Sequence, residues 1–367
     1  MTTIDTAPPQ QTSDAPPFAD RLFAAVLGAQ EVQAVALGHR MGWYRCLAED
    51  GPLHARALAT ATGTDERYAR EWLEHQAVCG YLVVEDPTAA PDRRRFTLPV
   101  EHAEVLVDAD STDFVAPLAW FVAGVGEHLG AIAEAYRTGA GVSWSALGPH
   151  VSEAQAAANR PMFLHQLGQE LLPQAPDVHA RLRAGARVAD VGTGHGWSAI
   201  GLARSFPDIT VDGFDVDAPS IEAARRNAAA AGVSDRVRFH HGDAAALRTA
   251  ESDYDVVFAF ECIHDLPDPV AVLSTMGELA GRDGVVVVMD ENVAPEFHAP
   301  GDEVERLMYG YSITCCLLDG RSHEHSAATG TVMRQNTLEG YAAAAGFSRV
   351  TVLPIDHDFF RFSRLHR

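Results

Sequence analysis

The run from Val188 to Gly196 constrains the fold of this chain more than any other part of its sequence. It starts as an apolar strand, passes through Asp190 and ends in Gly-x-Gly-x-Gly at Gly192, Gly194 and Gly196. Glycine accepts backbone conformations that a Cβ atom forbids, so the pattern predicts a tight strand-to-helix turn that an adenosine-type ligand can approach closely. A turn that binds a nicotinamide dinucleotide usually has one more residue before its third glycine. The run therefore predicts an α/β fold and argues against a dehydrogenase.

Two acidic residues follow the next predicted strands. These strands cover residues 209–214, 237–240 and 254–260. The first ends in Asp215, about twenty residues past the glycine turn, where a carboxylate can accept the ribose hydroxyls of a cofactor. The second leads to Asp243, which is placed to accept the exocyclic amine of an adenine, and the third leads to the tip at residues 261–267. Because parallel strands end along one edge of a sheet, we expect these groups to surround one ligand.

These features occur in the order and spacing of the class I S-adenosylmethionine-dependent methyltransferases, which the chain resembles over roughly residues 181 to 367. The resemblance implies an α/β, Rossmann-like domain with a seven-stranded sheet, and S-adenosylmethionine as the cofactor. It also implies that the glycine turn and the residues after the next strands bind this cofactor, namely Asp190, Gly192, Gly194, Gly196, Asp215, Val216, Asp243, Ala244 and Phe260.

A different pattern precedes this domain. Residues 54–61 and 64–80 predict two helices joined at Gly63, and the apolar segments 81–84 and 95–98 predict a β-hairpin. Together they make a winged helix-turn-helix. Its second helix has the wrong charge for a phosphate backbone, because four acids face two arginines: Asp65, Glu66, Glu71 and Glu74 against Arg67 and Arg70. A cofactor-sensing DNA-binding regulator is therefore the weaker alternative. The segment resembles the amino-terminal domain of small-molecule methyltransferases, which implies a homodimer.

Four segments follow from these patterns. Residues 1–17 are rich in proline and lack bulky apolar residues, so we expect a disordered tail. Residues 18–108 form the winged-helix domain. Residues 109–180 form a helical linker that covers the substrate pocket, and residues 181–367 form the cofactor-binding catalytic domain.

The amino-acid composition limits the classes of molecule that the protein is expected to bind. Fifty acidic and 28 basic residues give a net charge of −22, which repels nucleic acids and anionic membranes. Five cysteines without Cys-x-x-Cys spacing indicate neither a disulfide framework nor a zinc site. No leader pattern opens the sequence, and no apolar stretch is long enough to span a bilayer, so we expect a cytoplasmic enzyme acting on a small molecule.

The apolar and aromatic side chains of the linker either fill a core or line an apolar pocket. Aromatic residues concentrate between residues 113 and 172, and we expect an acceptor that is small and largely apolar. The candidate pocket residues are Trp120, Phe121, Trp144, Phe163, Trp197 and Arg334.

Three residues are candidates for the group that removes a proton. Glu170 follows Phe163 by seven residues, which places both on nearly the same side of a helix, and a carboxylate beside an apolar pocket is suited to general-base work. His264 and Asp265, in the tip after the fourth strand, are its rivals.

The acceptor atom stays open between oxygen and carbon. If it is the alkene of a prenyl diphosphate, Glu170 removes the proton and the aromatic residues stabilise a carbocation. The cations available to hold the diphosphate, with Mg²⁺, are Arg321, His323, His325, Arg334, His357 and Arg361. The spacing in His323-Glu324-His325 is a poor metal signature, so no resident metal is predicted.

Overall fold

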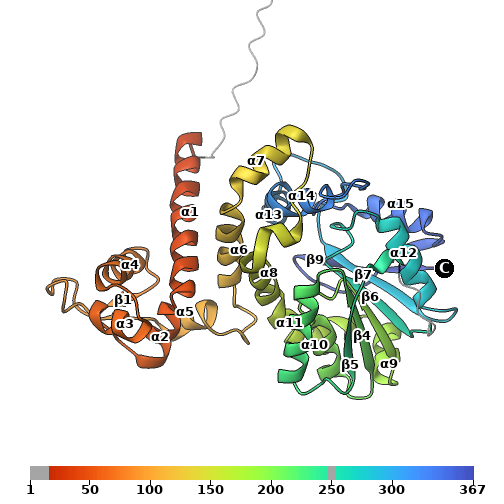
Figure 1. Ribbon diagram of the computed structural model, residues 1–367, viewed down its shortest axis with the longest axis horizontal. Coiled ribbons are helices and arrows are strands. Elements are labelled where there is room, and N and C mark those ends of the chain that lie inside the picture. The colour runs from red at the N-terminus through yellow and green to blue at the C-terminus, as the bar shows by residue number, and fades with distance from the viewer. Residues whose placement is uncertain (1–15, 247–252) are drawn as a thin grey trace, which may run out of the picture. The chain divides into compact units, whose positions relative to one another are not determined.

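The protein is described by a computed structural model that covers residues 16–246 and 253–367 (Figure 1). The chain divides into two compact units between Leu98 and Pro99. Most of the predicted tail, residues 1–17, lies outside the described residues. The predicted linker at 109–180 belongs to the same unit as the sheet, so it is part of that domain rather than a separate body.

The smaller unit contains the predicted helix-turn-helix and hairpin. Its elements are α1 (Phe18–Arg40), α2 (Trp43–Asp50), α3 (Ala55–Thr62), α4 (Glu66–Val78), β1 (Val83–Val84) and β2 (Phe96–Thr97). Gly63, with φ of 67°, ends α3, and the carboxylate of Asp65 caps α4 by accepting the backbone N–H groups of Arg67 and Tyr68. The strands β1 and β2 pair antiparallel as the wing.

The larger unit is built on one seven-stranded sheet. Its strands are β3 (Arg187–Val191), β4 (Thr210–Asp215), β5 (Val237–His241), β6 (Val256–Phe260), β7 (Val285–Glu291), β8 (Arg349–Val352) and β9 (Phe360–His366). They lie in the order β5-β4-β3-β6-β7-β9-β8. The first five are parallel, and β9 pairs antiparallel with both β7 and β8. The predicted Rossmann-like fold with a seven-stranded sheet is confirmed.

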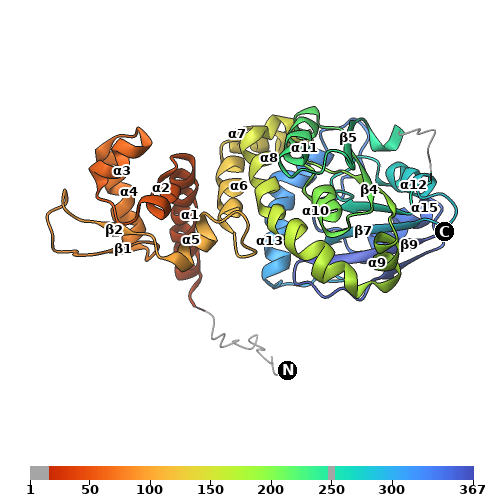
Figure 2. The same ribbon diagram turned by 90° about the horizontal axis from the view of Figure 1, so that it is seen from below.

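Helices cover both faces of this sheet (Figures 1 and 2). One face packs against α9 (Pro176–Arg183), α10 (Trp197–Ser205) and α11 (Ala218–Ala230). The other packs against α12 (Pro269–Leu279) and α15 (Gln335–Ala344). Burial on both faces explains why β6 and β7 are continuous apolar runs rather than alternating ones.

A further group of helices comes from the linker and from an insertion after β7. The helix α5 (Val100–Leu106) falls in the segment predicted as the winged-helix domain but belongs to the larger unit. The linker forms α6 (Ala116–Gly126), α7 (Leu129–Thr138), α8 (Trp144–Pro161), the π-helix η1 (Met162–Leu171) and the short η2 (Leu172–Gln174). The insertion forms α13 (Glu303–Tyr311), the π-helix η4 (Ser312–Cys316) and α14 (Leu317–Gly320). Phe121 and Val125 of the linker share one apolar cluster with Cys315 and Leu318 of the insertion, so the two segments pack together.

Within the predicted helical linker, α6 and α7 follow each other directly and are bent by 62°. In the described part of the chain, no single helix is long and apolar enough to cross a membrane. Taken together, the bent pair α6 and α7 has the length and the apolar composition of a membrane span, and nothing beyond length and composition indicates one.

The segment predicted as an α-helix over 159–172 is mostly the π-helix η1. It packs directly on α10, because a Cβ atom at Gly201 would overlap the carbonyl group of Phe163. The helix that follows the glycine turn is thus fixed against the linker.

Candidate active site

Two cavities adjoin each other in the larger unit. The turn cavity, of about 360 Å³, lies at the carboxyl ends of β3, β4 and β6 and is lined by the glycine turn. The outer cavity, of about 710 Å³, is lined by α6, α8, η1, the insertion and the tip after β6. An open α/β sheet binds its ligands at this edge.

The glycine turn has the conformation that its sequence predicts. Gly192, Gly194 and Gly196 have φ values of 73°, 52° and 81°. A Cβ atom at Gly192 would lie 2.6 Å from the sulfur of Cys262, and one at Gly196 would lie 2.5 Å from the ring of Phe239. Gly194 has nothing within 4 Å of that position, so it leaves the backbone open to a ligand.

Asp190 has a supporting role rather than the predicted place beside the cofactor. It is 1% exposed and lines neither cavity. Its carboxylate accepts hydrogen bonds from Thr193 Oγ1 at 2.7 Å and Ser198 Oγ at 2.6 Å. Burial raises its pKa to about 6. Asp190 therefore fixes the two ends of the turn to each other.

Asp215 lines the turn cavity, as do the predicted Val216, Asp243, Ala244 and Phe260. Its Oδ2 accepts the N–H of Gly194 at 2.8 Å, and its Oδ1 accepts the N–H of Asp217 at 2.8 Å. Each oxygen of a carboxylate has a second lone pair. Asp215 is thus held by the turn with acceptor capacity left for two ligand hydroxyls.

The predicted pocket residues separate into four groups. Phe163 and Trp197 line the turn cavity, Phe121 lines the outer cavity, and Trp144 lines both. Two residues line neither cavity. The ring of Trp120 packs edge-on against Phe114, 5.6 Å between centroids.

Arg334 is the second residue outside both cavities, and the structure corrects its assignment to the pocket. Its guanidinium donates to Glu305 at 2.5 Å and to the carbonyl of Ala294 at 2.5 Å. The other side chains predicted to hold a diphosphate also donate hydrogen bonds to protein groups or lie in different parts of the site. Arg321 donates to the carbonyl of Gly139, and Arg361 donates to the carbonyl of Val293. His323 lines only the turn cavity.

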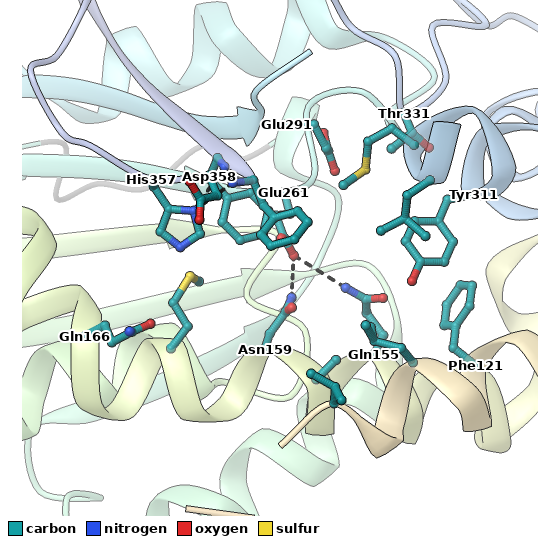
Figure 3. A pocket seen from close by; sticks show the side chains of 18 of the residues that line it. Phe121, Gln155, Asn159, Gln166, Glu261, Glu291, Tyr311, Thr331, His357 and Asp358 are labelled. Carbon is teal, nitrogen blue, oxygen red and sulfur yellow. Dashed lines mark hydrogen bonds between the residues drawn. The ribbon is translucent and has the colours of Figure 1, made fainter. Parts of the chain in front are cut away.

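The two cavities meet at five shared lining residues: Trp144, Gln155, Asn159, Glu261 and Asp265. Figure 3 shows the side chain of Glu261 in the outer cavity, with Gln155 and Asn159 of α8 pointing toward it. A chemical group that is transferred between ligands in the two cavities has to pass these five residues.

Glu261 is the functional candidate that the sequence reasoning missed. Its carboxylate accepts hydrogen bonds from Asn159 Nδ2 and, at 3.4 Å, from Gln155 Nε2. Its φ of 50° is rare for a residue other than glycine, and such strain concentrates at functional sites. Burial raises the pKa of Glu261 to about 7. The one available signal was its position directly after the apolar strand β6.

His264 lies in a buried cluster of carboxylates. It is 3% exposed, and its Nδ1 lies 2.6 Å from Asp290 and 3.1 Å from Glu291, while its Nε2 lies 3.3 Å from Asp265. Although burial opposes the charged imidazole, these three carboxylates together raise its pKa well above the usual range. The pKa of Asp290 is lowered, despite its burial, by the charge of His264. The three carboxylates thus favour the imidazolium form of His264, and their contacts with it order the cluster.

Glu170, the first candidate base, lies at the exposed rim of the outer cavity. It does not line the turn cavity. Among the three predicted bases, Asp265 alone lines both cavities.

The sheet order, the glycine turn and the acid after β4 define a Rossmann-like domain, a fold that commonly binds nucleoside cofactors at this edge of its sheet. Residues 182–328 match the family model described as a methyltransferase domain, and residues 30–108 match the model described as an Rv2258c-like winged HTH domain. The chain thus contains a segment that matches a methyltransferase domain, preceded by a segment that matches a winged helix-turn-helix domain.

A curated relative and two crystal structures agree with these matches. The 27-O-demethylrifamycin SV methyltransferase of Amycolatopsis mediterranei is 30% identical over 149 residues, which are 40% of this chain and 54% of the relative. The chain thus spans about half the length of that relative. An O-methyltransferase family protein from Burkholderia thailandensis shares the fold with a TM-score of 0.67 at 17% identity, over 96% of this chain and 99% of that one. Human N-acetylserotonin methyltransferase, in complex with SAM, has a TM-score of 0.65 at 17% identity, over 97% and 99%.

Proposed function

We propose that this protein is an S-adenosylmethionine-dependent methyltransferase that binds the cofactor in the turn cavity and a small acceptor molecule in the outer cavity. The observation that carries the proposal is the meeting of the two cavities at Glu261 and Asp265. The curated relative, named as a 27-O-demethylrifamycin SV methyltransferase, supports an oxygen acceptor in a natural-product-like molecule.

The residues of the turn cavity fit this cofactor. Gly194 leaves backbone uncovered, Asp215 has free lone pairs for two ribose hydroxyls, and Asp243 lines the same cavity with a carboxylate suited to an adenine amine. When bound, S-adenosylmethionine supplies a methyl group on a sulfonium, which needs alignment more than activation.

The chain's own part in the reaction is to align the acceptor and to take its proton. Aromatic walls, including Phe121 and Trp144, hold an apolar skeleton in the outer cavity. As the acceptor oxygen gains the methyl group, its proton passes to a carboxylate at the meeting point of the cavities. Glu261, whose pKa burial raises to about 7, is suited to accept it near neutral pH.

Carbon methylation of a prenyl diphosphate receives no support from the site. The arginines predicted for it donate to protein groups, and no lysine exists in the sequence. The proposal therefore includes neither a diphosphate nor Mg²⁺.

The test is a calorimetric titration with S-adenosylmethionine and, separately, with a nicotinamide dinucleotide. We expect saturable binding of the first and none of the second. Incubation with methyl-labelled S-adenosylmethionine and extracts of the producing cells then identifies the acceptor by mass spectrometry. Tight dinucleotide binding without S-adenosylmethionine binding would show that the proposal is wrong.

We also propose that the smaller unit serves dimerisation rather than DNA binding. Five large apolar side chains on α1 are between 48 and 74% exposed: Phe18, Leu22, Phe23, Val26 and Leu27. Exposed apolar stripes of this kind mark protein interfaces. On the second helix of the helix-turn-helix, α4, the cation of Arg67 pairs with Glu71.

Sedimentation velocity is expected to show that the wild-type protein is a dimer and that the Phe23→Glu variant is a monomer. A monomeric wild-type protein would contradict this proposal.

A further inference from the structure

The lining of the outer cavity carries an unusual excess of acidic groups. Three carboxylates line its inner part: Glu261, Asp265 and Glu291. Four more lie at its exposed rim: Asp113, Glu170, Asp356 and Asp358. The basic side chains in the described lining are two histidines, His264 and His357.

The inner carboxylates outnumber the cations beside them, because His264 is shared between Asp265, Asp290 and Glu291. Nδ1 of His264 donates to Asp290 at 2.6 Å, so its one proton is already engaged where Glu291 approaches at 3.1 Å. Glu291 is 5% exposed, and its Oε2 has no hydrogen-bond partner among the described residues. Arg361, the cross-strand neighbour of Asp290, interacts electrostatically with Asp290 and Glu291, and its guanidinium donates a hydrogen bond to the carbonyl of Val293.

The protonation of the three inner carboxylates reflects their burial with so few cations. Burial raises the pKa values of Glu261 and Asp265, and it raises that of Glu291 well above the usual range. A cation beside a buried carboxylate favours its charged form. The inner part of the cavity is therefore a place where a bound cation would replace protons.

The opposite wall of the cavity is apolar and aromatic. Phe121 of α6 stacks edge-on with Tyr311 of α13, 5.1 Å between ring centroids, and both line the cavity (Figure 3). Met308 of the insertion also lines the cavity. Aromatic faces hold apolar skeletons and also attract cations.

We propose that the acceptor carries a positively charged amino group on an apolar skeleton, and that this ammonium group binds in the inner part of the outer cavity between Glu261, Asp265 and Glu291. The proposal rests on the proposed function only in taking the outer cavity as the acceptor site. An acceptor that carries a carboxylate or a diphosphate meets like charges there, which disfavour it.

The test uses three probes with one skeleton and different ends: tryptamine, tryptophol and indole-3-acetate. Each is titrated calorimetrically into protein saturated with S-adenosylhomocysteine. We expect tryptamine to bind at least about tenfold more tightly than tryptophol, and indole-3-acetate to bind most weakly, since an ion pair in a partly buried site favours the ammonium by this much or more. Binding of S-adenosylhomocysteine itself, measured first, tests the proposed function separately.

Two variants locate the effect. Glu261→Gln is expected to reduce tryptamine affinity about tenfold and to leave tryptophol affinity unchanged, because the amide keeps the size of the side chain without its charge. Glu170→Gln, at the exposed rim, is the matched control and is expected to change tryptamine affinity by less than about twofold.

A pH series gives an independent readout. Tryptamine affinity is expected to rise between pH 5.5 and 8 as Glu261, with its pKa of about 7, loses its proton, and to rise less in Glu261→Gln. The other titratable groups that act on or near Glu261 are His264, Asp265, Asp290 and Tyr311. Equal binding of the three probes, or of none of them, would overturn the proposal, and so would an unchanged preference in Glu261→Gln.

Discussion

Replacing Asp215 with alanine is expected to weaken the binding of S-adenosylmethionine at least about 100-fold. Hydrogen bonds to a charged acceptor contribute about 1.5–3 kcal/mol each, and Asp215 has a free lone pair on each oxygen for a ribose hydroxyl. The variant also leaves the N–H of Gly194 without its acceptor, so the glycine turn loses the contact that fixes its central residue. Calorimetric titration with S-adenosylmethionine measures the effect.

Two further variants make this result specific. Asp208→Ala changes an exposed acid of the same domain that lines neither cavity, and it is expected to bind the cofactor as the wild type does. Asp243→Ala removes one hydrogen bond to the adenine, so a smaller loss, about tenfold, is expected. If Asp215→Ala folds normally by circular dichroism and keeps its affinity within about threefold, Asp215 is not the ribose ligand.

Replacing His264 with glutamine is expected to lower the free energy of unfolding by about 3–5 kcal/mol. Removing one member of a buried ion pair leaves the other charge without compensation, which costs about this much. Here the imidazolium faces Asp265, Asp290 and Glu291, so its loss leaves several buried carboxylates together. Urea unfolding followed by circular dichroism at neutral pH measures the change.

His325→Gln is the matched control, because His325 is exposed and a surface substitution of this kind changes stability by about 0.5 kcal/mol or less. A loss below about 1 kcal/mol in His264→Gln would show that the cluster does not depend on a charged imidazole. The ion-pair account of this part of the site would then be wrong.

The parts of the site that the sequence predicted correctly depend on local patterns. The glycine turn lies between β3 and α10, and Asp215 ends β4, because strand ends and glycine spacing are visible along the chain. The role of Glu261 was not visible in this way. Its hydrogen-bond partner Asn159 is 102 residues away, on a helix whose packing against the tip is a tertiary feature.

The prediction for Glu170 depended on a helical period that the structure does not have. In an α-helix, seven residues bring Phe163 and Glu170 to nearly the same side. The segment is a π-helix, with hydrogen bonds from i to i+5 and more residues in each turn, so the two side chains diverge. Phe163 lines the turn cavity, whereas Glu170 reaches the rim of the outer one.

The neighbouring residues Trp120 and Phe121 also show what sequence composition leaves unspecified. Trp120 and Phe121 are consecutive on α6, and consecutive side chains on a helix point about 100° apart. Composition marked both as pocket residues, but Phe121 alone lines the outer cavity. Which of two adjacent rings faces a ligand depends on how the helix is rotated against its neighbours, and sequence composition does not specify that rotation.

The left-handed backbone at position 261 restricts how this site can diversify. Valine, isoleucine and threonine are strongly disfavoured in that conformation, whereas glycine, asparagine and aspartate tolerate it. Relatives or engineered forms with a different acceptor preference are therefore expected to vary the residues that face this position, such as Gln155, more freely than the position itself. The substrate range of such proteins would then change through substitutions in α8, while the tip after β6 stays the same.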